Sequence, residues 1–269
     1  QTSHTSGVSS AISGFTNANT SWAAGATFVF TGTAQNTGMS GYANISSASL
    51  YTVTWLGNTS LTLDKSLSLN VFNFTNSGLV NMGNFSLSLP SSAGALTGSG
   101  FGVSKMFVTN GTGILTRAVL SSGTGLPFTW PIGESTGTTE YSPVTIASIA
   151  SAGINGTIGF RVIDGVQSNM SPAVSYISRY WPCTVTGFNA TYTLGSSTFT
   201  YDAATDVVVG PEASLKGNIY SPTGSFWTEL ATSSAGSSVL TITSGLAGSF
   251  MPTSGGPYDI TGRIDIPTY

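Results

Sequence analysis

Short segments in which apolar and polar residues alternate fill the first half of the chain and constrain its fold most strongly. A period of two turns one face of a strand inward and leaves a Ser, Thr and Asn face outward, where rows of Asn and Thr can form ladders. Because the segments are short and end at Gly, Asn or Ser, they predict stacked rungs of a parallel β-helix. A meandering antiparallel sandwich with the same alternation is the alternative. The segments are Thr27–Phe30, Leu50–Trp55, Ser60–Leu63, Ser66–Phe74, Leu79–Met82, Asn84–Leu89 and Lys105–Val108.

The second half contains longer alternating segments that Gly and Pro residues separate. About seven such strands at this spacing predict an Ig-like β-sandwich. The last segment carries Ile260, Ile264 and Ile266 on one face. It is either the closing strand of the sandwich or a strand offered to another copy. The segments are Ser142–Ile146, Thr157–Ile163, Tyr176–Tyr180, Ala190–Leu194, Asp206–Val209, Phe226–Leu230, Ser238–Thr243 and Ile260–Ile266.

A change in composition between residues 116 and 133 divides the chain. Of the 11 prolines, only Pro90 precedes Pro127. Residues 1–133 contain three basic residues and one acid, whereas residues 134–269 contain four basic residues and nine acids. We therefore predict an all-β protein with two domains. Residues 1–118 form a β-helix-like domain with an N-terminal extension, and residues 119–269 form an Ig-like β-sandwich.

Charged residues make up only 6% of the chain, against about a quarter in an ordinary globular domain. Hydroxyls, amides and backbone must cover the surface, so strand edges lack the charges that normally prevent pairing with neighbours. A net charge of −3 with seven basic residues argues against nucleic-acid binding. No segment is apolar enough for membrane insertion. The chain begins at Gln1 without Met, which we interpret as the processed N-terminus of an exported, extracellular protein.

Few residues in the sequence support catalysis. The single histidine, His4, lies in a polar N-terminal tail, and the single cysteine, Cys183, has apolar neighbours. Neither a nucleophile with a histidine base nor a zinc site is therefore expected. Asp64 is the only acid in the first half, and one carboxylate makes neither a calcium cluster nor a glycosidase pair.

Four acids of the second half are candidate functional groups. Asp202 and Asp206 can bind calcium together with loop carbonyls, but we interpret them as turn and strand-edge residues. Glu134 and Glu140 flank a loop rich in Gly and Thr, and we interpret them as solvated. We expect no catalytic residues, no metal and no cofactor. An enzyme with an unrecognised carboxylate pair in the sandwich is a third hypothesis.

Several stretches carry a family resemblance in a fixed order. They are Trp22–Gln35, Ser104–Arg117, Trp130–Glu134 with Tyr141–Ile146, and Ser178–Trp181. Together they resemble adhesin-like surface proteins that Bacteroidota export through the type IX secretion system, in which a β-helix precedes a sandwich. The resemblance implies a secreted, surface-attached or matrix protein without catalytic residues. The C-terminal sorting domain of such proteins is not recognisable here, and we expect either its removal on export or another export route.

The leading hypothesis is an extracellular structural subunit that self-assembles head-to-tail into a filament, sheath or surface layer. The opposite charges of the two halves steer such a contact, and strand-like chain ends complete a neighbour's sheet. Contacts that do not close a ring produce open fibres. The partner is then another copy of the chain. The candidate assembly contacts are Val8, Ile12, Lys65, Lys105, Arg117, Ile260, Ile264 and Ile266.

The alternative is a cell-surface adhesin or carbohydrate-binding module, with a surface polysaccharide as partner. The five tryptophans, together with ten tyrosines, can stack on sugar rings. Tryptophan in an alternating strand usually packs inward, however. Exposed, coplanar aromatic side chains would favour this alternative. The tryptophans are Trp22, Trp55, Trp130, Trp181 and Trp227.

Overall fold

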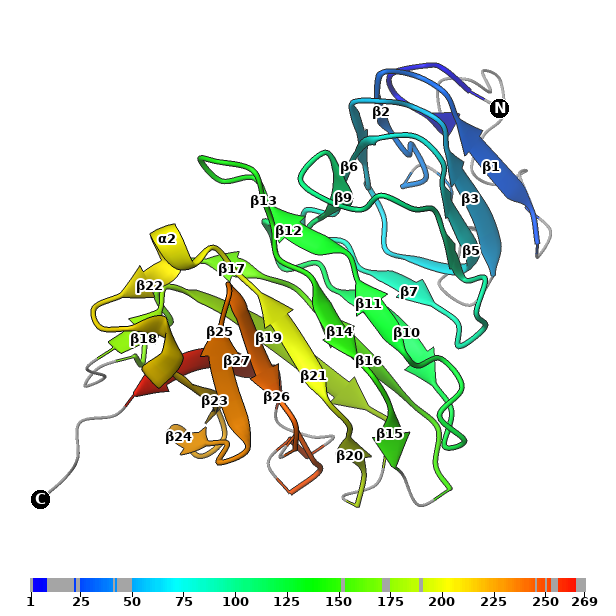
Figure 1. Ribbon diagram of the computed structural model, residues 1–269. Coiled ribbons are helices and arrows are strands. Elements are labelled where there is room, and N and C mark those ends of the chain that lie inside the picture. Colours follow the sequence, from blue (N-terminus) through cyan, green and yellow to red (C-terminus); the bar gives the residue numbers. More distant parts are fainter. Residues whose placement is uncertain are drawn as a thin grey trace, which may run out of the picture.

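The protein is all-β, and its strands form the layers seen in Figure 1. The computed structural model describes residues 2–8, 22, 25–40, 42, 50–150, 153–170, 175–188, 191–244, 246–249, 251–252 and 256–264. Two short helical elements, α2 (Ala203–Asp206) and the 3-10 turn η1 (Glu212–Ser214), lie between strands. In the described ranges, no helix has the length and apolar character needed to cross a bilayer.

Three ladders of parallel strands make up the first half, and from β5 (Leu67–Phe74) to β10 (Leu115–Val119) the chain visits each ladder in turn. Strands that are neighbours in space lie one winding apart in the sequence, as in the pair of Thr27 with Thr52. We call these strands the parallel region. The first ladder contains β1 (Thr27–Phe30), β3 (Tyr51–Trp55), β5 (Leu67–Phe74) and β8 (Leu96–Thr97). The second contains β2 (Ala34–Asn36), β4 (Ser60–Thr62), β6 (Gly78–Asn81), β9 (Lys105–Val108) and β12 (Ile132–Glu134). The third contains the start of β5, β7 (Leu87–Leu89) and β10 (Leu115–Val119).

Alternation explains both faces of the parallel region. Phe30, Trp55 and Phe74 pair in register on successive strands, and all three are fully buried. On the outward face, Asn73 Nδ2 donates to Thr54 Oγ1 at 2.9 Å, and Thr97 Oγ1 donates to Asn73 Oδ1 at 2.8 Å. Aromatic rows inside and hydroxyl–amide rows outside therefore run across the strands, as the period of two predicts.

Residues 2–8 pack on the first winding of the parallel region. Thr2 forms a parallel bridge with Phe30, and its N–H donates to Val29 O at 2.9 Å. Val8 is buried, and its N–H donates to Thr37 O at 3.1 Å. This segment therefore pairs with the end of β1 and with Asn36 of β2, on the sides of these strands that face away from β3 and β4.

Strand β10 joins the two halves of the molecule. It pairs in parallel with β7 and antiparallel with β16 (Gly156–Phe160). From β16 the sheet continues through β19 (Arg179–Thr186) to β27 (Tyr258–Ile264), and one 14-stranded sheet spans both halves (Figure 1). The predicted boundary between residues 118 and 119 thus falls inside β10, and β12 extends a parallel ladder beyond it.

Within the described residues, every pair of strands that both follow β10 is antiparallel, although β12 also pairs in parallel with β9 of the first half. Strand β27 pairs with β19, β18 and β23, which makes it an interior strand, so Ile260–Ile264 belongs to the chain's own sheet. We call the strands of this half the antiparallel region. The remaining members of the large sheet are β17 (Ile163–Asp164), β18 (Ser175–Ile177), β22 (Val207–Val208), β23 (Lys216–Ser221) and β24 (Phe226–Glu229).

A second, five-stranded sheet packs against the large one. Trp130 and Phe199 from this sheet contact Phe160 of the large sheet at ring-centroid distances of 5.1 and 6.0 Å, and Phe199 also lies 5.3 Å from Trp181. These buried rings form the core between the two sheets. The order of the second sheet is β11 (Phe128–Trp130), β14 (Val144–Ile146), β21 (Ser197–Thr200), β26 (Val239–Ile242) and β25 (Ser233–Gly236). The short strands outside it are β13 (Glu140–Tyr141), β15 (Ile149–Ala150) and β20 (Thr193–Leu194).

Candidate functional site

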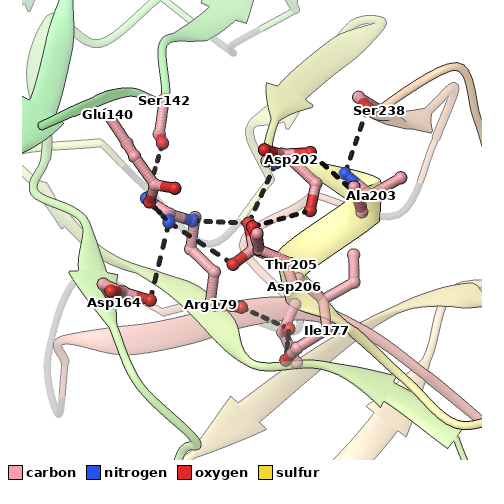
Figure 2. Close-up of polar contacts among 12 residues, drawn as sticks. Glu140, Ser142, Asp164, Ile177, Arg179, Asp202, Ala203, Thr205, Asp206 and Ser238 are labelled. Atoms are coloured by element: carbon pink, nitrogen blue, oxygen red, sulfur yellow. Dashed lines mark hydrogen bonds and ion pairs between the residues drawn. The ribbon is translucent and has the colours of Figure 1, made fainter. Parts of the chain in front are cut away.

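A fully buried arginine, Arg179, lies at the centre of a group of charged side chains. Strand β19 turns it toward the core, on the same face as Trp181 and Cys183. A guanidinium in the core needs partners for its N–H donors and a compensating negative charge. Figure 2 shows that these partners converge on it from different parts of the antiparallel region.

Three carboxylates and a hydroxyl surround the guanidinium. Nε donates to Asp206 Oδ2 at 2.8 Å, and Nη1 donates to Ser142 Oγ at 2.8 Å. Nη2 donates to Glu140 and lies 3.5 Å from Asp164 Oδ1. Burial by itself lowers the pKa of Arg179, but hydrogen bonds and charges from Asp206 and Glu140 outweigh burial and raise that pKa. The site therefore contains a permanent positive charge.

The short helix α2 fixes Asp206 in this arrangement. Asp202 caps the helix, because its side chain accepts the N–H of Ala204 at 2.9 Å. The N–H of Asp202 in turn donates to Asp206 Oδ2 at 2.9 Å. Asp202 is thus the turn residue that the sequence predicted, whereas Asp206 is a buried ion-pair partner and not a strand-edge residue.

Glu134, at the end of β12, lies beside this group and is only 2% exposed. Its Oε2 accepts the N–H of Thr136 at 2.6 Å, while its Oε1 has no hydrogen-bond partner among the described residues. Burial and the charge of Asp164 raise the pKa of Glu134, although Thr136 and Arg179 act in the opposite direction. The prediction that Glu134 and Glu140 are solvated is wrong: Glu134 is buried, and Glu140 is paired with Arg179.

Glu134, Glu140 and Asp164 are the described residues that can hold a metal ion. Each contributes a carboxylate oxygen, and these oxygens lie within 4.8 Å of one another. A pocket of about 340 Å³ opens over Glu140, Asp164 and Asp206, but Glu134 does not line it.

Lys105 and Arg117 do not lie at the surface, where the proposed head-to-tail contact requires them. Arg117 is 3% exposed; its Nε donates to Gly125 O at 2.7 Å, and its guanidinium lies 4.1 Å from the centre of the Phe128 ring. Lys105 is 6% exposed, and its Nζ donates to Thr75 O at 3.2 Å. Both charges are directed at the chain's own carbonyls and rings, so neither is free to meet another copy.

The other candidate contacts are also held by the chain itself where the structure describes them. Val8 and Ile260 are buried, and Ile264 is half-buried against the core. Lys65 is half-exposed, and its Nζ donates to Tyr42 O at 2.8 Å. Ile12 and Ile266 lie outside the described residues. The structure therefore does not gather these residues into one surface.

Side chains considered for catalysis or sugar stacking are separated as well. Cys183 is completely buried, and burial raises the pKa of its thiol. His4 is exposed near the N-terminus, away from that cysteine. Of the tryptophans, three are fully buried and cannot act as stacking platforms; they are Trp55, Trp130 and Trp181.

Arg179 is the central residue that sequence reasoning missed. Its strand alternates, and the positions two and four residues further on, Trp181 and Cys183, face the core. Period-two alternation therefore places Arg179 inward too, and an inward arginine requires nearby acids. Which acids form ion pairs with Arg179 depends on long-range strand pairing, and the local sequence pattern does not reveal this pairing.

No family model, curated protein or solved structure matches this chain. The resemblance to proteins exported by the type IX system therefore stays a prediction.

Proposed function

We propose that this protein is a non-catalytic structural subunit of an extracellular filament, sheath or surface layer, in which copies of the chain cover one another. The distribution of charge carries this proposal. The chain has seven basic and ten acidic residues. Six of them are buried: Lys105, Arg117, Glu134, Arg179, Asp206 and Arg263. The surface is therefore poorer in charge than the composition alone implies, and it offers little repulsion between copies.

The proposed architecture is a β-helix followed by an Ig-like sandwich. Three parallel ladders visited in turn are the arrangement expected of β-helix windings. Two antiparallel sheets with a shared aromatic core are the arrangement expected of a sandwich. In this proposal the two parts are fused through the sheet that β10 continues, without a linker between them.

Strand edges of the antiparallel region are the surfaces best suited to contact between copies. Strand β24 pairs only with β23 among the described strands, so one of its edges is unpaired. Phe226 in β24 is 55% exposed and lines a pocket of about 400 Å³ that β24 shares with β23 and Tyr258 of β27. An unpaired edge next to an exposed aromatic ring favours pairing with a second copy. In this proposal β24, and not a terminal strand, pairs with the neighbouring copy, because residues 2–8 and 258–264 already pair with strands of the same chain.

Electron microscopy of two lysine variants tests this contact. Thr228→Lys places a charge on the edge strand β24, where it opposes pairing with another copy. Thr198→Lys is the matched control: it is also half-buried, but it lies on β21, which has neighbours on both sides. We expect ordered polymers from the unchanged chain and from Thr198→Lys, and their loss in Thr228→Lys. Polymers of equal length from all three would contradict the role of β24.

A polysaccharide-binding adhesin is the alternative that one observation favours. The pocket beside β24 combines the exposed ring of Phe226 with hydroxyls from residues such as Ser221, Thr223 and Thr228. An aromatic face with surrounding hydroxyls can hold a sugar ring. Retention of a monodisperse monomer on a polysaccharide column, and its loss in Phe226→Ala, would support the adhesin over the subunit.

A further inference from the structure

The carboxylates around Arg179 outnumber the positive charges near them. Glu134, Glu140, Asp164 and Asp206 supply four carboxyl groups. Among the described ion pairs, Arg179 is the basic residue that binds these carboxylates. Unpaired negative charge in a partly buried site is costly unless a cation or a proton offsets it. The imbalance is confined to the side of the site away from Asp206, which Arg179 binds through Nε.

A second observation points to the same place. Glu134 is only 2% exposed, yet its Oε1 has no hydrogen-bond partner in the described part of the chain. Native proteins rarely leave a buried carboxylate oxygen without a partner. Glu134 also belongs to the three residues whose carboxylate oxygens approach one another within 4.8 Å.

These oxygens lie close enough together to surround a calcium ion. Calcium binds carboxylate oxygens at about 2.3–2.6 Å, so oxygens on opposite sides of the ion are about 5 Å apart. Calcium also accepts an irregular shell of carboxylates and waters, whereas magnesium requires near-octahedral geometry and loses its waters reluctantly. The contacts of Arg179 use Oε2 of Glu140 and Oδ1 of Asp164. The second oxygen of each carboxylate is therefore available to an ion, and the adjoining pocket admits the waters that complete its shell.

We propose that Glu134, Glu140 and Asp164 bind one Ca²⁺ ion. Glu134 comes from β12, the last strand of the parallel ladder, whereas Asp164 comes from β17, which pairs with β19. The ion therefore connects the end of the parallel region to the antiparallel region. Its role is structural: it neutralises the excess negative charge and holds the junction of the two regions together.

Calorimetric titration of the full chain tests the site directly. The protein is treated with EDTA, exchanged into chelator-free buffer and titrated with CaCl₂. We expect saturable binding at one site with a Kd of about 0.1–1 mM, the range of extracellular calcium modules, and weaker binding of Mg²⁺. Ca²⁺ should also raise the Tm, because it binds the folded state.

Variants decide whether these three residues are the ligands. Glu134→Gln and Asp164→Asn should each weaken Ca²⁺ binding roughly tenfold or more, because each removes a charged oxygen ligand. Glu229→Gln, which removes one exposed acid from β24, is the control and should bind as the unchanged chain does. If Glu134→Gln does not fold, the more exposed Asp164 still gives the answer through Asp164→Asn.

Three results would overturn the proposal. They are absence of saturable Ca²⁺ binding at about 10 mM, tenfold above the expected range; unchanged affinity in Asp164→Asn; and tighter binding of Mg²⁺ than of Ca²⁺. Each is measured on the single chain. The outcome is therefore independent of whether copies associate, and it does not bear on the proposed subunit function.

Discussion

The parallel and antiparallel regions bury charged side chains in different ways. In the parallel region, Arg117 donates to backbone carbonyls and lies over Phe128, without a carboxylate partner among the described residues. In the antiparallel region, Arg179 is bound by Asp206 and Glu140 and lies near Asp164. Both arginines stand on the core face of an alternating strand. The comparison teaches that this chain, which is poor in charge, uses buried charged side chains to connect its strands, and that the group around Arg179 carries an excess of negative charge.

Replacing each arginine by methionine gives the largest expected effect. Arg179→Met leaves Asp206 buried without its counter-ion, and we expect a loss of about 3–5 kcal/mol in the free energy of unfolding. Arg117→Met removes hydrogen bonds to neutral carbonyls, and we expect a smaller loss of about 1–3 kcal/mol. Urea unfolding at neutral pH measures both. Equal losses of unfolding free energy in the two variants would contradict the claim that the two regions bury their arginines in different ways.

Much of the strand pattern could be predicted from the sequence, because alternation is a local property. The segment 27–30 coincides with β1, and 105–108 coincides with β9. The missed strand β10 shows where this fails. Arg117 occupies one of the core-facing positions of β10, where an apolar residue is expected. Its charge predicts an exposed side chain, whereas the alternation of the strand predicts a buried one. The prediction that Lys105 and Arg117 lie at the surface rests on their charge and not on the alternation of their strands.

The candidate site could be predicted only in part. Glu134 and Glu140 flank one loop in the sequence and pair across β12 and β13, but Arg179 and Asp164 join them only through the fold. Glu134 lies on β12, which pairs with β9 of the parallel region, whereas Arg179 lies on β19. No local pattern indicates that these strands meet. The change in composition near residues 116–133 was real, but it does not mark a linker: β10 carries one sheet across it.

Asp64, the single acid of residues 1–133, provides the next test. Burial alone would raise its pKa, but hydrogen bonds from Thr37 and Ser40 and from the backbone of Met39 and Ser40 outweigh burial and lower the pKa below 3.8. Because the folded-state pKa is depressed, this stabilisation is complete above the unfolded pKa of about 3.9 and is lost as the pH falls through the folded value.

Asp64→Asn should therefore cost about 1–2 kcal/mol at pH 7, since a half-exposed carboxylate loses its charge-assisted bonds. The difference from the unchanged chain should shrink on acidification below about pH 4. Lys65→Met, at the next position in the chain, removes one hydrogen bond to Tyr42 O and should lower the free energy of unfolding by less. Urea unfolding at several pH values measures these differences. A loss for Asp64→Asn that does not depend on pH would refute the assigned role of its charge.

The outward polar rows give the smallest expected effect. Asn73 bridges Thr54 and Thr97 across three strands of the parallel region, so Asn73→Ala removes two hydrogen bonds and should cost about 1 kcal/mol. Thr145→Ala removes one exposed bond, to Thr129 in the antiparallel region, and should cost about 0.5 kcal/mol or less. Thermal unfolding of the two variants compares them. A larger loss for Thr145→Ala would mean that the rows do not stabilise the stack.

Sedimentation velocity of the unchanged chain over a range of concentrations tests the central claim most directly: that copies cover one another through a surface with few charges. Such contacts are only weakly screened by salt. We therefore predict species larger than the monomer, growing with concentration, in both about 0.15 M and about 1 M NaCl. A single monomer boundary at every concentration and both salt levels would contradict the claim.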